Sequence, residues 1–102
     1  NNNESIKMSM RFIATFKKTC SFNDWLELID KLKPHLEKHG IRMIFATESE
    51  DGQSIYDIAE AKTMEGVEAF LSDPDVRKMR IDAGVDIDSH QVISGIGDFQ
   101  SF

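Results

Sequence analysis

Apolar and polar residues alternate along residues 10–17, with Met10, Phe12, Ala14 and Phe16 on one face of the pattern. A period of two with aromatic side chains predicts a β-strand. The same reasoning predicts strands at residues 41–48, 54–62 and 91–97. In the last of these, Val92 and Ile96 are expected on one face and Ile93 on the other.

Between the first two strands, apolar residues recur at helical spacing. The predicted buried stripe consists of Trp25, Leu28, Ile29, Leu32 and Leu36. Ser21 is expected to cap the helix start, and Gly40 suits the position just after its end. Pro34 interrupts the stripe and predicts either a kink near Lys33 or a second segment that begins at Pro34.

Two shorter helices are predicted after the third strand. The first starts at Thr63 and faces inward with Val67, Phe70 and Leu71. Asp73 and Pro74 then supply a cap and a first-turn proline for the second helix, which is expected to end at Gly84. Its predicted buried residues are Val76, Met79 and Ala83.

Asp51 and Gly52 predict a two-residue type I′ hairpin between the second and third strands, because both turn positions need positive φ. The resulting register has two sets of facing residues. One face pairs Thr47 with Tyr56, Phe45 with Ile58 and Met43 with Glu60, and the other pairs Ala46 with Asp57, Ile44 with Ala59 and Arg42 with Ala61.

This order of elements predicts an α+β ferredoxin-like fold, a split β-α-β arrangement with one antiparallel sheet in the order 4-1-3-2. All helices then cover one sheet face, and Met43, Phe45, Tyr56 and Ile58 occupy the bare one. Because an exposed apolar face is costly in water, we expect a homodimer that pairs sheet to sheet as a dimeric α/β barrel. Residues 1–8 are expected to form a disordered polar leader, and residues 9–102 a single domain.

Composition narrows the function classes. The 102 residues are 40% hydrophobic and 29% charged, with a net charge of −6. Such acidity disfavours nucleic-acid binding. The absence of a long apolar run or a signal-peptide pattern leads us to expect no membrane partner and a cytoplasmic location. The single cysteine, Cys20, excludes an internal disulfide and cannot alone form a metal cage.

Three segments resemble a known superfamily: Phe22-Asn23-Asp24-Trp25, His39-Gly40-Ile41 and Phe70-Leu71-Ser72-Asp73-Pro74. Over residues 10–97 the chain resembles the dimeric α/β-barrel superfamily of ferredoxin-like proteins, which includes antibiotic-biosynthesis-monooxygenase-like enzymes. It is most similar to small uncharacterised marine microbial members.

The resemblance implies a pocket for an apolar or aromatic ligand between two sheets, and in some members oxygenation without a cofactor. Haem-degrading members place an Asn on the first strand and a Trp on a later helix. In this sequence Asn23 and Trp25 instead lie together at the start of one predicted helix. No cofactor is therefore expected.

The candidate ligand-binding residues are Phe45, Thr47, Tyr56, Ile58, Glu60 and His90, with no metal site expected. The Tyr56 hydroxyl could orient a ligand, and a desolvated Glu60 could act as a base. Asp57 needs a partner if its face meets the helices, and Arg11, Arg77 and Arg80 are the candidates.

His35 and His39, four residues apart, have near metal-ligand spacing, but a solvated helix end is the favoured interpretation.

Three functions remain open. The leading hypothesis is a homodimer that binds a small hydrophobic molecule between its sheets. The second is a cofactor-independent monooxygenase or isomerase with Tyr56, Glu60 or His90 as acid or base. The third is an interaction module without a small-molecule site.

Overall fold

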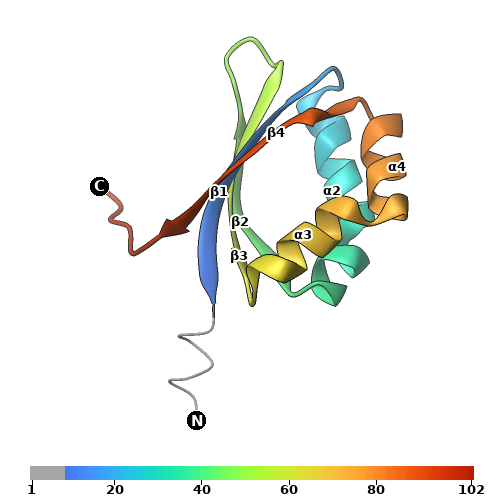
Figure 1. Ribbon diagram of the computed structural model, residues 1–102. Helices are drawn as coiled ribbons and strands as arrows, with labels where there is room; N and C mark the ends of the chain where they lie inside the picture. The colour runs from blue at the N-terminus through green and yellow to red at the C-terminus, as the bar shows by residue number, and fades with distance from the viewer. Residues whose placement is uncertain (1–8) are drawn as a thin grey trace.

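The computed structural model describes residues 9–102, so the expected leader at residues 1–8 lies outside the described residues. The elements are β1 (Met10–Lys18), α2 (Phe22–Lys38), β2 (Ile41–Glu48), β3 (Ser54–Ala61), α3 (Met64–Ser72), α4 (Pro74–Asp82) and β4 (Val85–Ile96). The strands form one antiparallel sheet in the order β2-β3-β1-β4, and the three helices lie together on one side of it (Figure 1). The predicted ferredoxin-like topology is confirmed.

The hydrophobic core lies between the sheet and the helices. Alternation along β1 sends Phe12, Ala14 and Phe16 into this layer, where they meet Trp25 and Leu32 of α2. The opposite side chains of β1 belong to the open face of the sheet, which points away from α2, α3 and α4 (Figure 1).

Helix α2 is one continuous element that contains Pro34, so the alternative of a second segment beginning there is wrong. Leu32 and Leu36 are buried on either side of the proline, and this packing holds the helix together across the missing backbone donor. The predicted ends are confirmed: Ser21 Oγ accepts the Asp24 N–H at 3.1 Å, and Gly40 follows the helix at φ +70°.

The hairpin between β2 and β3 has a longer loop than predicted, because residues 49–53 separate the strands. Gly52 has positive φ but Asp51 does not, so the type I′ turn is wrong. The Asp51 carboxylate instead accepts hydrogen bonds from Ser49 Oγ at 2.6 Å and from the Gln53 N–H at 3.0 Å. The predicted register is nevertheless confirmed next to the loop, where Thr47 pairs with Tyr56.

A bulge at Ile44 changes the faces of the residues before it in β2. Met43 pairs with Ala59 and turns toward the helices, whereas Arg42 pairs with Glu60 on the open face. The predicted faces of Met43 and Arg42 are therefore wrong, because one extra residue reverses the alternation.

Strand β4 begins at Val85, earlier than the predicted Gln91, because Val85 pairs with Lys18 at the end of β1. A second irregularity lies at Gly95, which has a φ of +73°. It places Ile96 beside Arg11 on the open face, so the prediction that Ile96 shares a face with Val92 is wrong.

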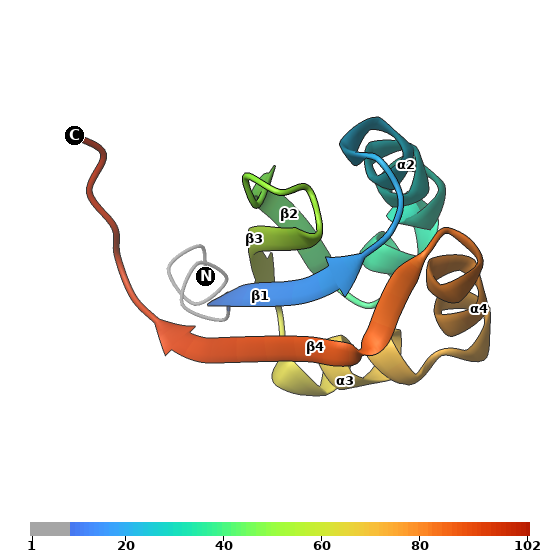
Figure 2. The ribbon, with the colours of Figure 1, turned by 90° about the horizontal axis from the view of Figure 1, so that it is seen from above.

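The tail after β4 leaves the sheet on the side away from the helices (Figure 2). Its Phe99 and Phe102 side chains are exposed, although the Arg11 guanidinium lies 5.1 Å from the Phe99 ring centroid. Among residues 9–102, no helix is long and apolar enough to cross a membrane.

Candidate functional site

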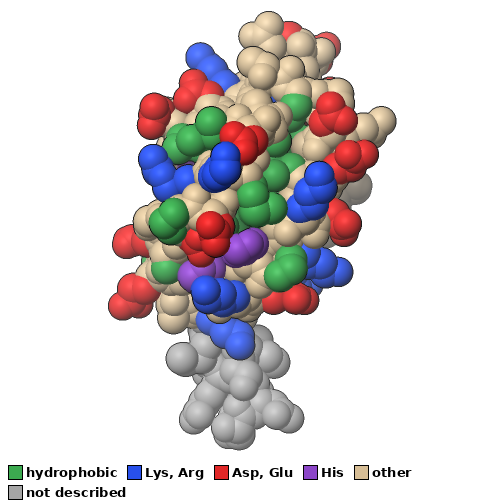
Figure 3. Space-filling view, turned by 90° about the vertical axis from the view of Figure 1, so that its right-hand side faces the viewer, with side chains coloured by type: hydrophobic (Ala, Val, Ile, Leu, Met, Phe, Trp, Pro, Cys, Tyr) green, Lys and Arg blue, Asp and Glu red, His purple; other side chains and the backbone are tan. Residues whose placement is uncertain are grey.

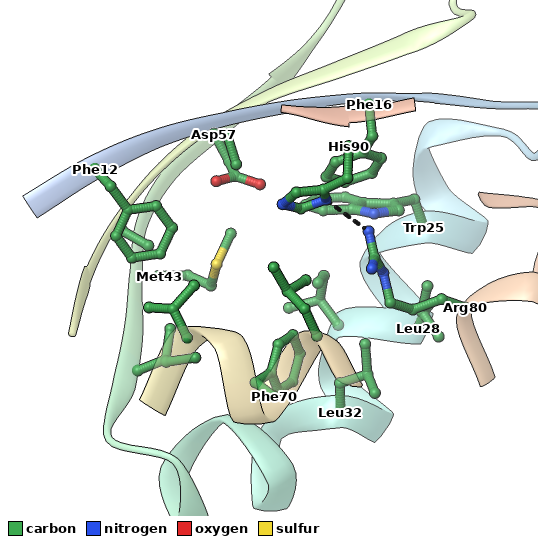
Figure 4. A pocket seen from close by; sticks show the side chains of 16 residues that line it. Phe12, Phe16, Trp25, Leu28, Leu32, Met43, Asp57, Phe70, Arg80 and His90 are labelled. Atoms are coloured by element: carbon green, nitrogen blue, oxygen red, sulfur yellow. Dashed lines mark hydrogen bonds between the residues drawn. The ribbon is translucent and has the colours of Figure 1, made fainter. Parts of the chain in front are cut away.

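A cavity lies inside the layer between the sheet and the helices (Figure 4). Its volume is about 50 Å³. Most of its walls are apolar and aromatic, as in sites for small organic ligands. The lining includes Phe12, Phe16, Trp25, Leu28, Leu32, Met43, Phe70, Asp57, Arg80 and His90.

Asp57 is the carboxylate of this cavity. It faces the helices because its pairing partners in β1 and β2 are Ala14 and Ala46, and these small residues leave space above it. The residue is only 6% exposed, and its carboxylate points into the cavity (Figure 4).

Within residues 9–102 no hydrogen bond or salt bridge reaches the Asp57 side chain. Burial therefore raises the pKa of Asp57 to about 7, and the charge of Arg80 offsets only part of that effect.

Arg80 and His90 form the second polar feature of the cavity. Arg80 lies one helical turn after the fully buried Val76 of α4 and is 5% exposed. Its Nη2 atom is 3.0 Å from His90 Nδ1, and both groups pack on Phe16. The His90 and Phe16 rings are stacked, with centroids 5.3 Å apart and planes within 7°.

Burial shifts both pKa values toward the uncharged forms. It lowers the pKa of Arg80 to about 10, so the guanidinium stays charged at neutral pH. It lowers the pKa of His90 to about 4, and the positive charge of Arg80 adds to this shift. His90 is consequently neutral at physiological pH.

The contact with Arg80 also determines the tautomer of His90. A guanidinium has only donors, so His90 Nδ1 must accept this hydrogen bond. A neutral imidazole with an accepting Nδ1 carries its proton on Nε2. His90 therefore presents a hydrogen-bond donor at its remaining nitrogen and is not poised to act as a base.

An irregular stretch of β4 sets the position of His90. The β1 ladder pairs Thr15 with Gln91 and then Lys17 with Asp86, so several β4 residues lie opposite Phe16 alone. Ser89 Oγ accepts a hydrogen bond from the Lys17 N–H at 2.8 Å, in place of a backbone carbonyl of the neighbouring strand. Bulges of this kind re-aim side chains and are common near functional sites.

The predicted ligand-binding residues lie on two sides of the sheet. Strand pairing puts Phe45, Thr47, Tyr56, Ile58 and Glu60 on the open face. His90 is separated from them, because it lies on the helix side within the cavity.

Glu60 is held by two arginines. Arg11 Nη2 lies 3.1 Å from Glu60 Oε2, and Arg42 bonds to Glu60 Oε1. Hydrogen bonds from Arg42 and Arg11 keep the pKa of Glu60 below its usual range. A carboxylate stabilised in this way is a poor base.

His35 and His39 lie near Asp73 at the helix-covered surface, where histidine side chains gather in Figure 3. Asp73 Oδ2 is 3.6 Å from His39 Nε2 and 4.0 Å from His35 Nδ1. In the part of the chain that the structure describes, no group of three or more ligand-type side chains is arranged to hold a metal ion.

Sequence reasoning did not identify the cavity as the site, although it named Arg80 as a possible partner of Asp57. Two signals were present. Asp57 interrupts the apolar alternation of Ile55 and Ala59, and Arg80 follows Val76 at helical spacing. A charged residue at a buried position of an amphipathic pattern is informative because burial without a partner is costly.

No protein-family model and no curated protein matches the chain. Solved structures do. SnoaB, a cofactor-independent oxygenase from Streptomyces nogalater, has a TM-score of 0.62 at 11% identity, covering 90% of this chain and 95% of that one.

The ActVA-Orf6 monooxygenase of Streptomyces coelicolor, solved with Nanaomycin D, has a TM-score of 0.54 at 12% identity, covering 100% and 98%. A putative antibiotic biosynthesis monooxygenase from Chloroflexus aurantiacus has a TM-score of 0.50 at 18% identity, covering 90% and 97%. The chain therefore shares the ferredoxin-like α+β fold of these monooxygenase-like structures.

Proposed function

We propose that the protein binds a small aromatic molecule in the cavity between the sheet and the helices and removes a proton from it. The observation that carries this proposal is a buried carboxylate that points into an aromatic-lined cavity and has no hydrogen-bond or salt-bridge partner within residues 9–102 (Figure 4). A base is most effective when its pKa lies near the working pH, and the pKa of Asp57 is about 7.

The reaction class that best suits this arrangement is oxygenation without a cofactor. Removal of a proton by Asp57 leaves an electron-rich substrate anion, which can react directly with dioxygen. The fold is shared with SnoaB, described as a cofactor-independent oxygenase, and this supports the reaction class. For 1-naphthol the balanced reaction consumes one dioxygen and yields 1,4-naphthoquinone and one water.

The test has two stages with 1-naphthol as probe. Calorimetry measures binding to the wild type and to a Leu32→Trp variant, whose larger side chain is designed to fill the cavity. Oxygen uptake and quinone absorbance then measure turnover. Binding that Leu32→Trp abolishes, with turnover that Asp57→Asn abolishes, supports the proposal. Binding unaffected by Leu32→Trp would place the ligand elsewhere and contradict it.

We also propose that two copies associate through their open sheet faces. Three large apolar side chains lie exposed there: Phe45 is 57% exposed, Tyr56 46% and Ile93 61%. Ile13 and Ile58 lie between them in the same pairing rows. Covering such a patch with a second copy would remove costly apolar surface from water, and Glu60 with its arginines would lie among the polar contacts around it.

A further inference from the structure

We infer that the cavity selects molecules with an acidic hydroxyl conjugated to an aromatic ring, and that His90 donates its Nε2–H to the oxygen of the resulting anion. This inference rests on the proposed function and specifies the chemical class of its ligand. Arg80 acts as a positioning residue, because it fixes the tautomer of His90 through Nδ1.

The charges around the cavity favour an anion. Asp57 of β3, Arg80 of α4 and His90 of β4 are its titratable lining groups, and the lining from β1, β2, α2 and α3 is uncharged. Arg77, one turn before Arg80, adds positive charge from outside the lining. When Asp57 is protonated and His90 neutral, the guanidinium of Arg80 leaves the site with an unbalanced positive charge.

The proton transfer is balanced within the site. The hydroxyl O–H bond of the ligand breaks, and the proton bonds to an oxygen of the Asp57 carboxylate. The negative charge moves from Asp57 to the ligand oxygen, where the Nε2–H of His90 and the charge of Arg80 stabilise it. A neutral arene of the same shape gains none of these interactions.

The roles proposed for His90 as donor and for Arg80 as positioning residue can be tested by substitution, because His90 stacks on Phe16 and another ring can replace it there. His90→Phe keeps an aromatic ring at the stack but removes the donor, and His90→Gln restores a donor amide. Arg80→Met removes the charge and the tautomer control while keeping an unbranched side chain. Circular dichroism and thermal melting verify that each variant is folded.

The probe pair is 4-nitrophenol, whose anion absorbs visible light, and nitrobenzene, which has no hydroxyl. We expect the wild type to bind 4-nitrophenol at least about tenfold more tightly than nitrobenzene. If the site binds the 4-nitrophenol anion about tenfold more tightly than the neutral phenol, the pKa of the bound phenol falls by about one unit. His90→Phe and Arg80→Met should each reduce this shift, and His90→Gln should restore part of it.

A second readout needs no ligand. Nitrogen-15 NMR of the histidine side chains at pH 7 should show His90 as the Nε2–H tautomer in the wild type, with loss of that preference in Arg80→Met. His35 and His39 serve as internal references. An Nδ1–H or cationic His90 in the wild type would overturn the inference.

The outcomes separate the two proposals. Equal binding of 4-nitrophenol and nitrobenzene with an unshifted phenol pKa overturns the selection of acidic hydroxyls and leaves the aromatic-binding cavity intact. Binding of neither probe overturns both proposals.

Discussion

Arg80 Nη2 lies 3.0 Å from Nδ1 of His90 inside the mostly apolar layer between the sheet and the helices. Within residues 9–102 no carboxylate forms a salt bridge with that guanidinium. The pair therefore combines a buried positive charge with a neutral imidazole of defined tautomer. Asp57, the third polar group of the cavity, has no hydrogen-bond partner in that part of the chain, and Arg80 and His90 bond only one nitrogen each to the other, so all three retain bonding capacity for a ligand.

Asp57→Asn should stabilise the protein at pH 8. The wild-type carboxylate is ionised and buried there, and a pKa raised from 3.8 to about 7 corresponds to a cost of about 4 kcal/mol. Because a buried amide also lacks partners, the expected gain is about 2 kcal/mol or more by urea unfolding. The exposed Asp30→Asn change should alter stability by less than about 0.5 kcal/mol. Lower stability of Asp57→Asn than of the wild type at pH 8 would show that the charge is well solvated or paired.

Asp57 and His90 should give opposite pH dependences of stability. The folded pKa of Asp57 is raised, so its contribution is lost as pH rises from about 4 to 7. The folded pKa of His90 is lowered, so its contribution is lost as pH falls from 6.5 to about 4. His90→Phe should therefore lose stability as pH rises from 4.5 to 6.5, and Asp57→Asn should gain it, each by about 1.4 kcal/mol per pH unit.

The comparison between these two variants is the useful measurement, because titration of all other groups is common to both and cancels. Urea unfolding at half-unit pH steps provides it. Parallel curves would contradict the ionisation states assigned to the cavity.

Lys18 should be important for stability despite its charge. Its buried Nζ donates to Cys20 O at 2.7 Å, Glu48 Oε2 at 2.9 Å and Gly52 O at 2.7 Å, so it ties the end of β1 to the hairpin. Lys18→Met leaves these acceptors unpaired and should cost about 3 kcal/mol. Lys17→Met, at the exposed neighbour, should cost less than about 0.5 kcal/mol by the same unfolding assay. Equal effects of the two changes would refute this role.

Phe45→Asp should weaken the proposed dimer. A charge in the centre of an apolar interface is costly, so the variant should be monomeric by light scattering at concentrations where the wild type is dimeric. Ile81→Asp is the matched control, because Ile81 is 52% exposed on α4, on the helix side of the sheet. A dimer that survives Phe45→Asp but dissociates in Ile81→Asp would mean that copies meet through the helices.

The topology was predictable because the periods of two and 3.6, the caps at Ser21 and Asp73, and Gly40 all agree with one order of elements. The two bulges were not predicted. No short-range signal marks the extra residue at Ile44. Gly95 did carry one, because an isolated glycine within a strand pattern indicates a bulge, and its φ is +73°.

The candidate site was harder to predict than the fold. Pairing of Asp57 with Ala46 was anticipated correctly, and this put the carboxylate on the helix side. Its meeting with Arg80 and His90 depends on how α4 packs and on the irregular ladder of β4, which are tertiary features. The sequence prediction placed most of the ligand-binding residues on the open face because apolar and aromatic residues such as Phe45, Tyr56 and Ile58 recur there with a period of two.

The location of the ligand is the most direct test of the central claim. Backbone amide shifts in nitrogen-15 NMR spectra, followed during titration with 1-naphthol, report which side of the sheet it contacts. We predict that the largest changes cluster at Asp57, Arg80 and His90, around the cavity. Changes confined to Phe45 and Tyr56 on the open face, or no saturable change anywhere, would contradict a binding site between the sheet and the helices.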